Sequence, residues 1–396
     1  MALRLKLRSI FLSRHFSTSI LNPNSSKNPQ ATKQKSRAAL SLLRTENNPE
    51  RILEICRSAQ LTPESHLDRN VYSEAISKLK GLNYFNGIRA FFQESMARPD
   101  MKSERFVSHF MVLYGQAGMV DDARKTFEEM PQMGFDRTVK TLNALLFSCV
   151  LAKDHEEMKR VYMEFPVIYG IVPNLDTYNT VIKGFCESGD SSSCFSILAE
   201  MSRKGVKPNA TTFGAMIAGF YEEGKFEDVG KALEMMKEHG VSPGISIYNT
   251  RIKSLCKLGR SKEAKALFEG ILSRGYKPNN VTYNYLIHGF CKEGDLEEAK
   301  RLFERMVRSE IKPDGFCYFT LVYFLCKGEE FEAALKICRE CLAKGWVPNF
   351  TTMKLLVEGL ASISKVNEAK EIIRQLKEKF SLNADKWTEI EKGLAK

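Results

Sequence analysis

Residues 281 to 314 read VTYNYLIHGFCKEGDLEEAKRLFERMVRSEIKPD, and this stretch decides the fold. Apolar residues at 283, 286, 287 and 290 are spaced i, i+3, i+4 and i+7, which places them on one face of a helix. Gly294 ends that helix, and apolar residues at 299, 302, 303 and 306 repeat the spacing on a second helix. Glu297 precedes Arg301 by four residues on the solvent side of this helix, a spacing that favours ion pairing. Pro313 ends the hairpin, because proline cannot extend a helix.

The hairpin recurs every 35 residues. Prolines keep this interval at Pro173, Pro208, Pro243, Pro278, Pro313 and Pro348. Aromatic or large apolar residues keep it at Tyr178, Phe213, Tyr248, Tyr283, Tyr318 and Met353. A helical hairpin has two apolar stripes and cannot bury both alone, so neighbouring hairpins must stack. We therefore predict an all-α fold, a right-handed α-solenoid (superhelix) of stacked 35-residue helix-turn-helix repeats.

The same period predicts how the chain is divided. Nine repeats occupy residues 69–384 and start at 69, 104, 139, 175, 210, 245, 280, 315 and 350, and the third has one extra residue near Pro166. Residues 34–68 are expected to form a degenerate N-terminal helical pair. Residues 385–396 are expected to form a short polar C-terminal helix that caps the stack.

Charge is unevenly distributed along the chain. The net charge is +11, but residues 1–45 contain nine basic and no acidic side chains, and the remainder has 50 basic against 48 acidic. The N-terminus, MALRLKLRSIFLSRHFSTSI, alternates apolar and basic residues and then becomes rich in Ser and Thr, which is typical of a transit peptide. Residues 1–33 are therefore interpreted as a mitochondrial transit peptide and basic linker, and the location as the mitochondrial matrix. A disordered basic tail is the alternative.

The sequence offers no sign of catalysis, cofactor, metal or membrane span. The longest nearly apolar stretch, residues 316–326, has about half of the roughly 20 residues that a bilayer crossing needs. Cys186, Cys256, Cys291 and Cys326 follow the repeat period, as packing residues would, and the Cys338-x-x-Cys341 pair has no partner pair at zinc-ligand spacing. No nucleophile, base and orienting acid recur together, so we expect a protein that is not an enzyme and has no small-molecule substrate.

The stretch from 281 to 314 resembles the pentatricopeptide repeat, and the resemblance extends over about four fifths of the chain. Its uninterrupted 35-residue spacing is similar to the P class of plant organelle proteins. The resemblance implies that single-stranded RNA binds along the first helices, one base per repeat. It also implies that the fifth and last residues of a repeat read the base edge and that an apolar second residue clamps between bases.

These positions can be assigned by number. The implied base-reading residues are Asn143, Asn174, Asn179, Asn209, Asn249, Asn279, Asn284 and Asp314, four pairs that look pyrimidine-selective. The base clamps are Val281 and Phe316. Gly214, Phe319 and Lys354 interrupt the code at the fifth position. The second position is polar or charged at Asn70, Arg105, Lys140, Asp176, Thr211 and Ser246.

Lys257, Lys292 and Lys327 are also 35 residues apart, at a position that lies near the RNA backbone in the family. They are candidate phosphate ligands, although lysine near a helix C-terminus also suits the helix dipole. The neutral body and the interrupted code resemble the subgroup of P-class proteins built into the plant mitochondrial ribosome. We therefore expect an RNA-binding protein of mitochondrial translation, bound to ribosomal or messenger RNA and to mitochondrial ribosomal proteins. A free transcript-specific RNA adaptor and a protein scaffold remain the alternatives.

Overall fold

The computed structural model describes residues 29–60, 69–99, 103–380 and 384–394. These residues form α-helices and one short 3-10 helix, and they contain no strand. The fold is an all-α repeat solenoid, which confirms the predicted class. The chain divides into two units, residues 1–208 and residues 209–396, and each has its own packing. Most of the expected leader lies outside the described residues.

Unit 1 consists of helix pairs. Its elements are α2 (Pro29–Thr45), α3 (Pro49–Gln60), α4 (Arg69–Gly81), α5 (Phe85–Ala97), α6 (Glu104–Ala117), α7 (Val120–Glu129), η2 (Met130–Met133), α8 (Val139–Ala152), α9 (His155–Ile168), α10 (Leu175–Glu187) and α11 (Ser193–Arg203). The first helices of successive pairs, α4, α6, α8 and α10, pack against one another in sequence order. Helix α2 begins at Pro29, five residues before the expected start of the leading pair, as suits proline in the first turn of a helix.

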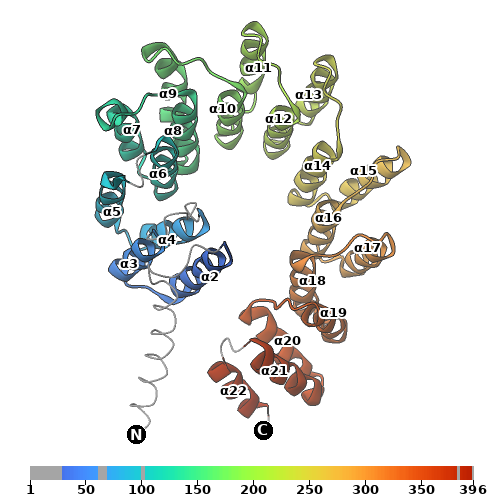
Figure 1. Ribbon diagram of the computed structural model, residues 1–396. Helices are drawn as coiled ribbons and strands as arrows, with labels where there is room; N and C mark the ends of the chain where they lie inside the picture. Colours follow the sequence, from blue (N-terminus) through green and yellow to red (C-terminus); the bar gives the residue numbers. More distant parts are fainter. Residues whose placement is uncertain (1–28, 61–68, 100–102, 381–383, 395–396) are drawn as a thin grey trace. The chain divides into compact units, whose positions relative to one another are not determined.

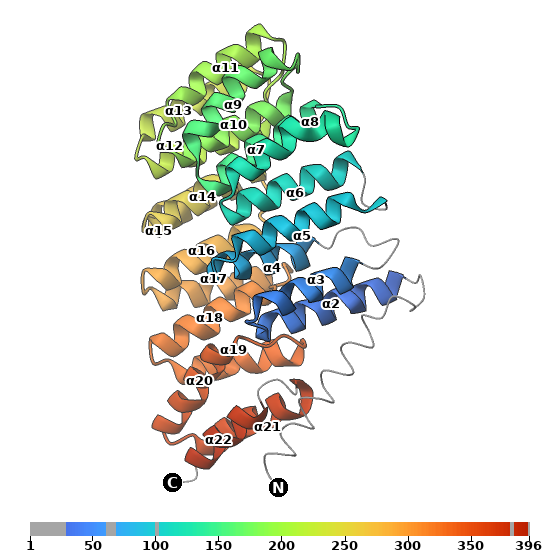
Figure 2. The ribbon, with the colours of Figure 1, turned by 90° about the vertical axis from the view of Figure 1, so that its left-hand side faces the viewer.

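Unit 2 repeats the arrangement. Its helices are α12 (Ala210–Glu222), α13 (Phe226–Glu238), α14 (Ile245–Lys257), α15 (Ser261–Ser273), α16 (Asn280–Lys292), α17 (Leu296–Arg308), α18 (Gly315–Lys327), α19 (Phe331–Ala343), α20 (Phe350–Ser362), α21 (Val366–Phe380) and α22 (Ala384–Gly393). Within this unit α12, α14, α16, α18 and α20 form one row, and the second helices lie alongside it (Figures 1 and 2). Helix α22 packs Trp387 against Phe350, with 4.8 Å between ring centroids.

The periodic apolar residues form the core of each unit. The six aromatic or large apolar side chains of the sequence period are all buried, at Tyr178, Phe213, Tyr248, Tyr283, Tyr318 and Met353. Each such side chain contributes about 1.5 to 3 kcal/mol when it leaves water. Both apolar stripes of the stretch from 281 to 314 are buried, one on α16 and one on α17. The predicted hairpin is confirmed.

The turn between α16 and α17 follows its sequence signals, but the charge pairing differs from the expected one. Gly294 has φ of 83°, a left-handed conformation that glycine adopts without strain, and Asp295 then caps the second helix, which begins at Leu296. Glu297 pairs with Lys300 rather than with Arg301, which is 3.6 Å from Glu298. Both ion pairs therefore join residues three positions apart rather than four, and side chains at either spacing are neighbours on a helix.

Helices α6 and α8 of unit 1 approach each other closely. A Cβ atom on Gly115 would lie 2.4 Å from the Ser148 Cα, so only glycine fits at this crossing. The Ser148 hydroxyl donates to the backbone carbonyl of Met111 at 2.7 Å and thereby ties the two helices together. This crossing sets how closely the two first helices lie side by side. One side of each first helix faces away from the second helices. We call that side, in each unit, the first-helix surface: α4, α6, α8 and α10 in unit 1, and α12, α14, α16, α18 and α20 in unit 2.

Candidate nucleic-acid interface

The predicted base-reading residues of unit 1 meet at the start of α10. Asn174 lies just before this helix, and its side chain accepts a hydrogen bond from the backbone N–H of Thr177 at 3.1 Å. Asn143, on α8, donates from Nδ2 to Asn174 Oδ1 at 3.1 Å. The Thr177 hydroxyl donates to Asn143 Oδ1 at 2.6 Å and completes the network. The fifth residue of one repeat and the last residue of that repeat are therefore adjacent in space.

Unit 2 contains the same network at the start of α16. Asn249 donates from Nδ2 to Asn279 Oδ1 at 3.3 Å, and the Thr282 hydroxyl donates to Asn249 Oδ1 at 2.7 Å. Asn279 also accepts from the Thr282 backbone N–H at 3.1 Å, so it caps the helix. Asn249 is 8% exposed. Its amide is thus held in one orientation by two partners.

The third pair, Asn284 and Asp314, differs in two residues: aspartate replaces the capping asparagine, and cysteine replaces the threonine. Asn284 Nδ2 donates to the two carboxylate oxygens of Asp314 at 3.1 and 3.0 Å. Cys317 occupies the position that threonine holds in the other two networks, and it brings no hydroxyl. The Oδ1 of Asn284 is buried and has no hydrogen-bond partner in the described protein. Because a carboxylate can only accept, the Asn284 amide must keep Nδ2 toward Asp314 and leave Oδ1 open.

The remaining pair, Asn179 and Asn209, is divided between the two units. Asn179 is half-buried on α10 in unit 1, whereas Asn209 belongs to unit 2. Asn209 caps α12 by accepting from the backbone N–H groups of Thr211 and Thr212 at 3.0 and 3.1 Å.

Sequence reasoning overlooked that the last residue of a repeat is the N-cap of the next first helix. The signal was present, because asparagine followed three residues later by threonine, just before an apolar periodic run, marks a helix start. This spacing occurs at Asn174, Asn209, Asn279 and Asn349, and each of these side chains caps its helix. The capping role restrains the last residue of a repeat before any ligand is present.

Both predicted base clamps are exposed on the first-helix surface of unit 2. The side chain of Val281 is 37% exposed and that of Phe316 is 53% exposed. The Phe316 ring stacks on the His288 ring, with 6.1 Å between centroids and 27° between planes. Burial and the nearby charge of Lys292 lower the pKa of His288, which favours a neutral imidazole. A flat aromatic platform is therefore available beside Asn284.

The three predicted phosphate ligands are the last residues of α14, α16 and α18, and all are exposed. Lys257 is paired with Glu222, with 2.6 Å between Nζ and Oε1. Lys292 and Lys327 make no ion pair with any described residue. Their position at helix C-termini also suits the dipole, so both roles that the sequence allowed remain compatible with the geometry.

Three of the four phased cysteines are buried packing residues, whereas Cys186 is only half-buried. Cys256, Cys291 and Cys326 are buried, and burial raises their thiol pKa values to about 11, about 12 and about 12. Across the described ranges no cluster of His, Cys, Asp or Glu is arranged to hold a metal ion. Nor does any described helix have the length and apolar character needed to cross a bilayer.

Comparison with known proteins identifies the family. Profiles of the PPR repeat match residues 211–241, 246–276 and 274–307, the PPR repeat family matches residues 173–222, and the pentatricopeptide repeat domain matches residues 109–188. The crystal structure of PPR10 from maize is similar at 18% identity and a TM-score of 0.42, and the similarity covers 91% of this chain and 60% of that one.

Two relatives from Arabidopsis thaliana have informative names. The small ribosomal subunit protein mS79 is 31% identical over 166 residues, which are 42% of this chain and 42% of that protein. A mitochondrial pentatricopeptide repeat-containing protein is 57% identical over 362 residues, which are 91% of this chain and 89% of the relative. With that identity over nearly its whole length, this chain belongs to the pentatricopeptide repeat family.

Proposed function

We propose that this protein binds single-stranded RNA along its first-helix surfaces, has no chemistry of its own, and serves mitochondrial translation as a component or close associate of the ribosome. The nine helix pairs that begin at residues 69 to 350 are the binding array. The leading pair and the terminal helix close its ends, and residues 1–33 direct the protein into the matrix. The family membership and the mitochondrial relative support the RNA and the compartment.

One observation carries the RNA proposal: the fifth and last residues of a repeat are paired at the starts of the first helices α10, α16 and α18. An asparagine amide offers both a donor and an acceptor to the edge of a base. Asn284 keeps a buried acceptor without a partner at Oδ1, which suits the N–H group of a pyrimidine such as uracil once a small movement of the side chain exposes it. The neighbouring platform of Phe316 and His288 supplies a surface on which a base stacks.

The ribosomal part of the proposal follows from what the array lacks. Gly214 offers no side chain to a base, Phe319 can only stack, and Lys354 is 3.5 Å from Glu358. Most second positions are polar, so few bases are sandwiched, and each sandwich contributes about 1 to 3 kcal/mol. An array with so few platforms needs additional contacts, which folded ribosomal RNA and neighbouring ribosomal proteins supply. The similarity to the ribosomal protein mS79 supports this choice.

Sedimentation separates this proposal from the free-adaptor alternative. Matrix extract is run through a sucrose gradient at raised salt, and the protein is located by immunoblot. We expect it to sediment with a ribosomal subunit. Recovery near the top of the gradient, together with crosslinks to one messenger RNA, would favour the adaptor. Absence of any RNA crosslink would leave only protein partners and favour a scaffold.

Base reading is tested with the double variant Asn249→Ala/Asn284→Ala. We expect its affinity for a pyrimidine-rich RNA strand to fall at least tenfold, because two base edges lose their hydrogen-bonding partners. Asn367→Ala is the matched control, since Asn367 is exposed on the second helix α21. Melting curves of both variants show how much of the change arises from lost folding. Unchanged RNA affinity in the double variant would remove base reading from the proposal.

A further inference from the structure

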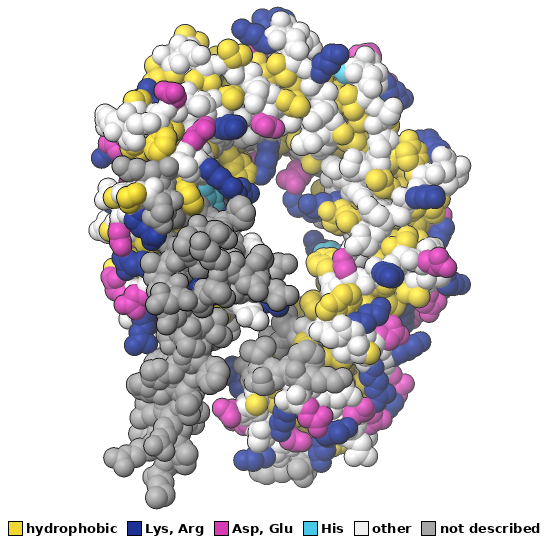
Figure 3. Space-filling model, viewed as in Figure 1, with side chains coloured by type: hydrophobic (Ala, Val, Ile, Leu, Met, Phe, Trp, Pro, Cys, Tyr) yellow, Lys and Arg dark blue, Asp and Glu magenta, His cyan; other side chains and the backbone are white. Residues whose placement is uncertain are grey.

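Three basic side chains gather on the first-helix surface of unit 1. Arg69 begins α4, Arg105 lies in the first turn of α6, and Lys140 lies in the first turn of α8. They line one open cavity of about 700 Å³ that is formed by these three helices. Figure 3 shows Lys and Arg side chains gathered on this side of α6 and α8. In the repeats that begin at 104 and 139, the cations occupy the second position, where the family places an apolar clamp.

These three cations have no acidic partners among the residues that the structure describes. Arg69, Arg105 and Lys140 are exposed and make no ion pair with any described residue. Glu104 is the acidic residue of the cavity lining, and its carboxylate accepts the Thr138 hydroxyl. The described residues of the lining therefore carry an excess of two positive charges. A positive cavity with low-dielectric walls attracts anions more strongly than isolated surface cations do.

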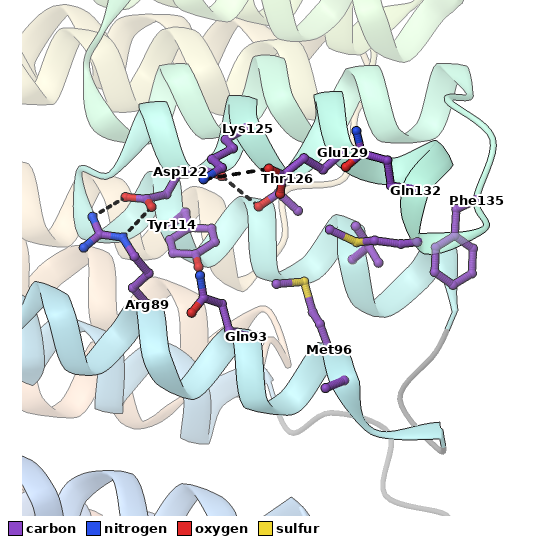
Figure 4. Close-up of a pocket in the computed structure, with 13 residues that line it drawn as sticks. Arg89, Gln93, Met96, Tyr114, Asp122, Lys125, Thr126, Glu129, Gln132 and Phe135 are labelled. Carbon is purple, nitrogen blue, oxygen red and sulfur yellow. Dashed lines mark hydrogen bonds and ion pairs between the residues drawn. The ribbon is translucent and has the colours of Figure 1, made fainter.

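The second-helix side of the same unit shows the opposite pattern. There α5, α6 and α7 line a cavity of about 410 Å³ (Figure 4). Its arginine, Arg89, forms a bidentate pair with Asp122 at 2.7 and 2.8 Å, and Lys125 is 3.8 Å from Glu129. The basic residues Arg89 and Lys125 of this second cavity thus have acidic partners, unlike those of the first-helix cavity.

The first-helix cavity also contains a polar atom without a partner. His109 lines it, and its Nε2 is buried and makes no hydrogen bond with any described residue. Burial and the charges of Arg69 and Arg105 lower the pKa of His109 to about 4, so the imidazole is neutral at physiological pH. A neutral imidazole can donate or accept one further hydrogen bond.

We propose that this cavity binds the sugar-phosphate backbone of RNA, through about three phosphate groups, without reading bases. The inference rests on the proposed RNA-binding function and adds to it a division of labour between the two units. Asparagine pairs and an aromatic platform in unit 2 suit bases, whereas Arg69, Arg105 and Lys140 suit phosphates. The lining runs from the first turns of α4, α6 and α8 to Gln116 and Leu151 near the C-termini of α6 and α8, so the attraction for anions comes from the three cations rather than from the helix dipoles.

Salt dependence tests the proposal. The probes are a 20-nucleotide oligouridylate and an abasic 20-mer that has the same sugar-phosphate chain without bases. The variant is Arg69→Gln/Arg105→Gln/Lys140→Gln, measured from 50 to 200 mM salt. Each phosphate contact contributes about 0.7 to the slope of log affinity against log salt for a single strand. We expect the slope to fall by about 2 for both probes, so that the wild type loses about 20-fold more affinity over this range than the variant does.

Two control proteins isolate the effect of position from that of charge. Arg203→Gln/Lys204→Gln/Lys207→Gln removes the same charge from exposed residues at the end of α11 and the loop that follows it, and its slope should stay near that of the wild type. Arg69→Lys/Arg105→Lys/Lys140→Arg keeps the cavity charge and should keep the slope.

Several results would overturn the proposal. These are an unchanged slope in the cavity variant, an equal fall in the α11 control, and a loss that affects oligouridylate but spares the abasic strand. Wild-type protein that binds neither strand would overturn both this inference and the proposed function. A cavity-dependent slope together with unchanged affinity in the Asn249→Ala/Asn284→Ala variant would remove base reading alone. Preferential binding of an acidic peptide to the cavity would point to a protein ligand and count against RNA.

Discussion

Replacing Cys317 with threonine should stabilise unit 2 and lower its affinity for RNA. In the two complete networks a threonine hydroxyl donates to the fifth-position asparagine, at 2.6 Å from Thr177 and 2.7 Å from Thr282. Asn284 lacks this donor, and its Oδ1 is buried without a partner. The substitution Cys317→Thr supplies the missing hydroxyl at a buried position of similar size.

The magnitude follows from the atoms involved. An unsatisfied buried acceptor costs about 1 to 3 kcal/mol, and the new hydroxyl removes most of that penalty. The hydroxyl also completes a capping box with Asp314, as Thr282 does with Asn279. Exchange of a thiol for a more polar group offsets part of the gain. We expect a net increase of about 1 to 2 kcal/mol in the free energy of unfolding of this region.

Amide hydrogen exchange is the suitable assay, because repeat arrays can unfold locally and a single global transition is then undefined. Protection of α16 and α18 should rise in the Cys317→Thr variant and fall in Thr282→Cys, the reciprocal change. Cys317→Val is the control, since it keeps the shape of threonine without the hydroxyl. Affinity for oligouridylate should fall about fivefold in Cys317→Thr if Oδ1 serves a base. Equal protection in the threonine and valine variants would refute the reasoning about the open acceptor.

Three further predictions concern both units. Gly115→Val should destabilise the packing of α6 on α8 by at least about 2 kcal/mol, measured by amide hydrogen exchange of these helices, because its Cβ would lie 2.4 Å from the Ser148 backbone, whereas Gly81→Val, whose Cβ would meet no atom within 4 Å, should cost less. His109 has a pKa of about 4 in the folded chain against about 6.5 in an unfolded one, so the unfolded chain binds more protons between these two pH values. The free energy of unfolding should therefore fall by about 2 kcal/mol as pH drops from 6.5 to 4. The variant His109→Gln should flatten that pH profile. Iodoacetamide at pH 8 should modify the half-buried Cys186 before the buried Cys291, whose pKa is raised to about 12, and equal rates measured by peptide mass spectrometry would contradict this order.

The sequence predicted the fold well because burial enforces its period. A residue such as Tyr283 must be apolar in every repeat, since the neighbouring hairpin covers it, and this requirement is visible as a 35-residue interval. The fifth and last positions were assigned from family resemblance, and the structure brings three of those pairs within hydrogen-bonding distance. Their use in binding RNA stays a prediction.

Other features could not be obtained from the sequence. The ion pair between Lys257 and Glu222 joins residues on neighbouring first helices and depends on side-chain directions that spacing alone does not give. The same holds for Arg69 and Arg105, which occupy different positions in their repeats and still line one cavity. The unpartnered acceptor of Asn284 depends on Cys317, which lacks the hydroxyl that Thr177 and Thr282 supply in the other two networks. Sequence spacing alone does not show that these hydroxyls donate to the fifth-position asparagines.

The residue that precedes each first helix caps that helix and is also a proposed base-reading residue. These two roles together limit how the RNA target of this protein can change. That residue closes the helix terminus, and only short polar side chains, or glycine at a small loss, do so cheaply. The sites in this chain hold Ser103, Thr138, Asn174, Asn209, Gly244, Asn279, Asp314 and Asn349. Only about five residue types are therefore tolerated at this position. Larger residues would destabilise the helix terminus whatever RNA they could recognise.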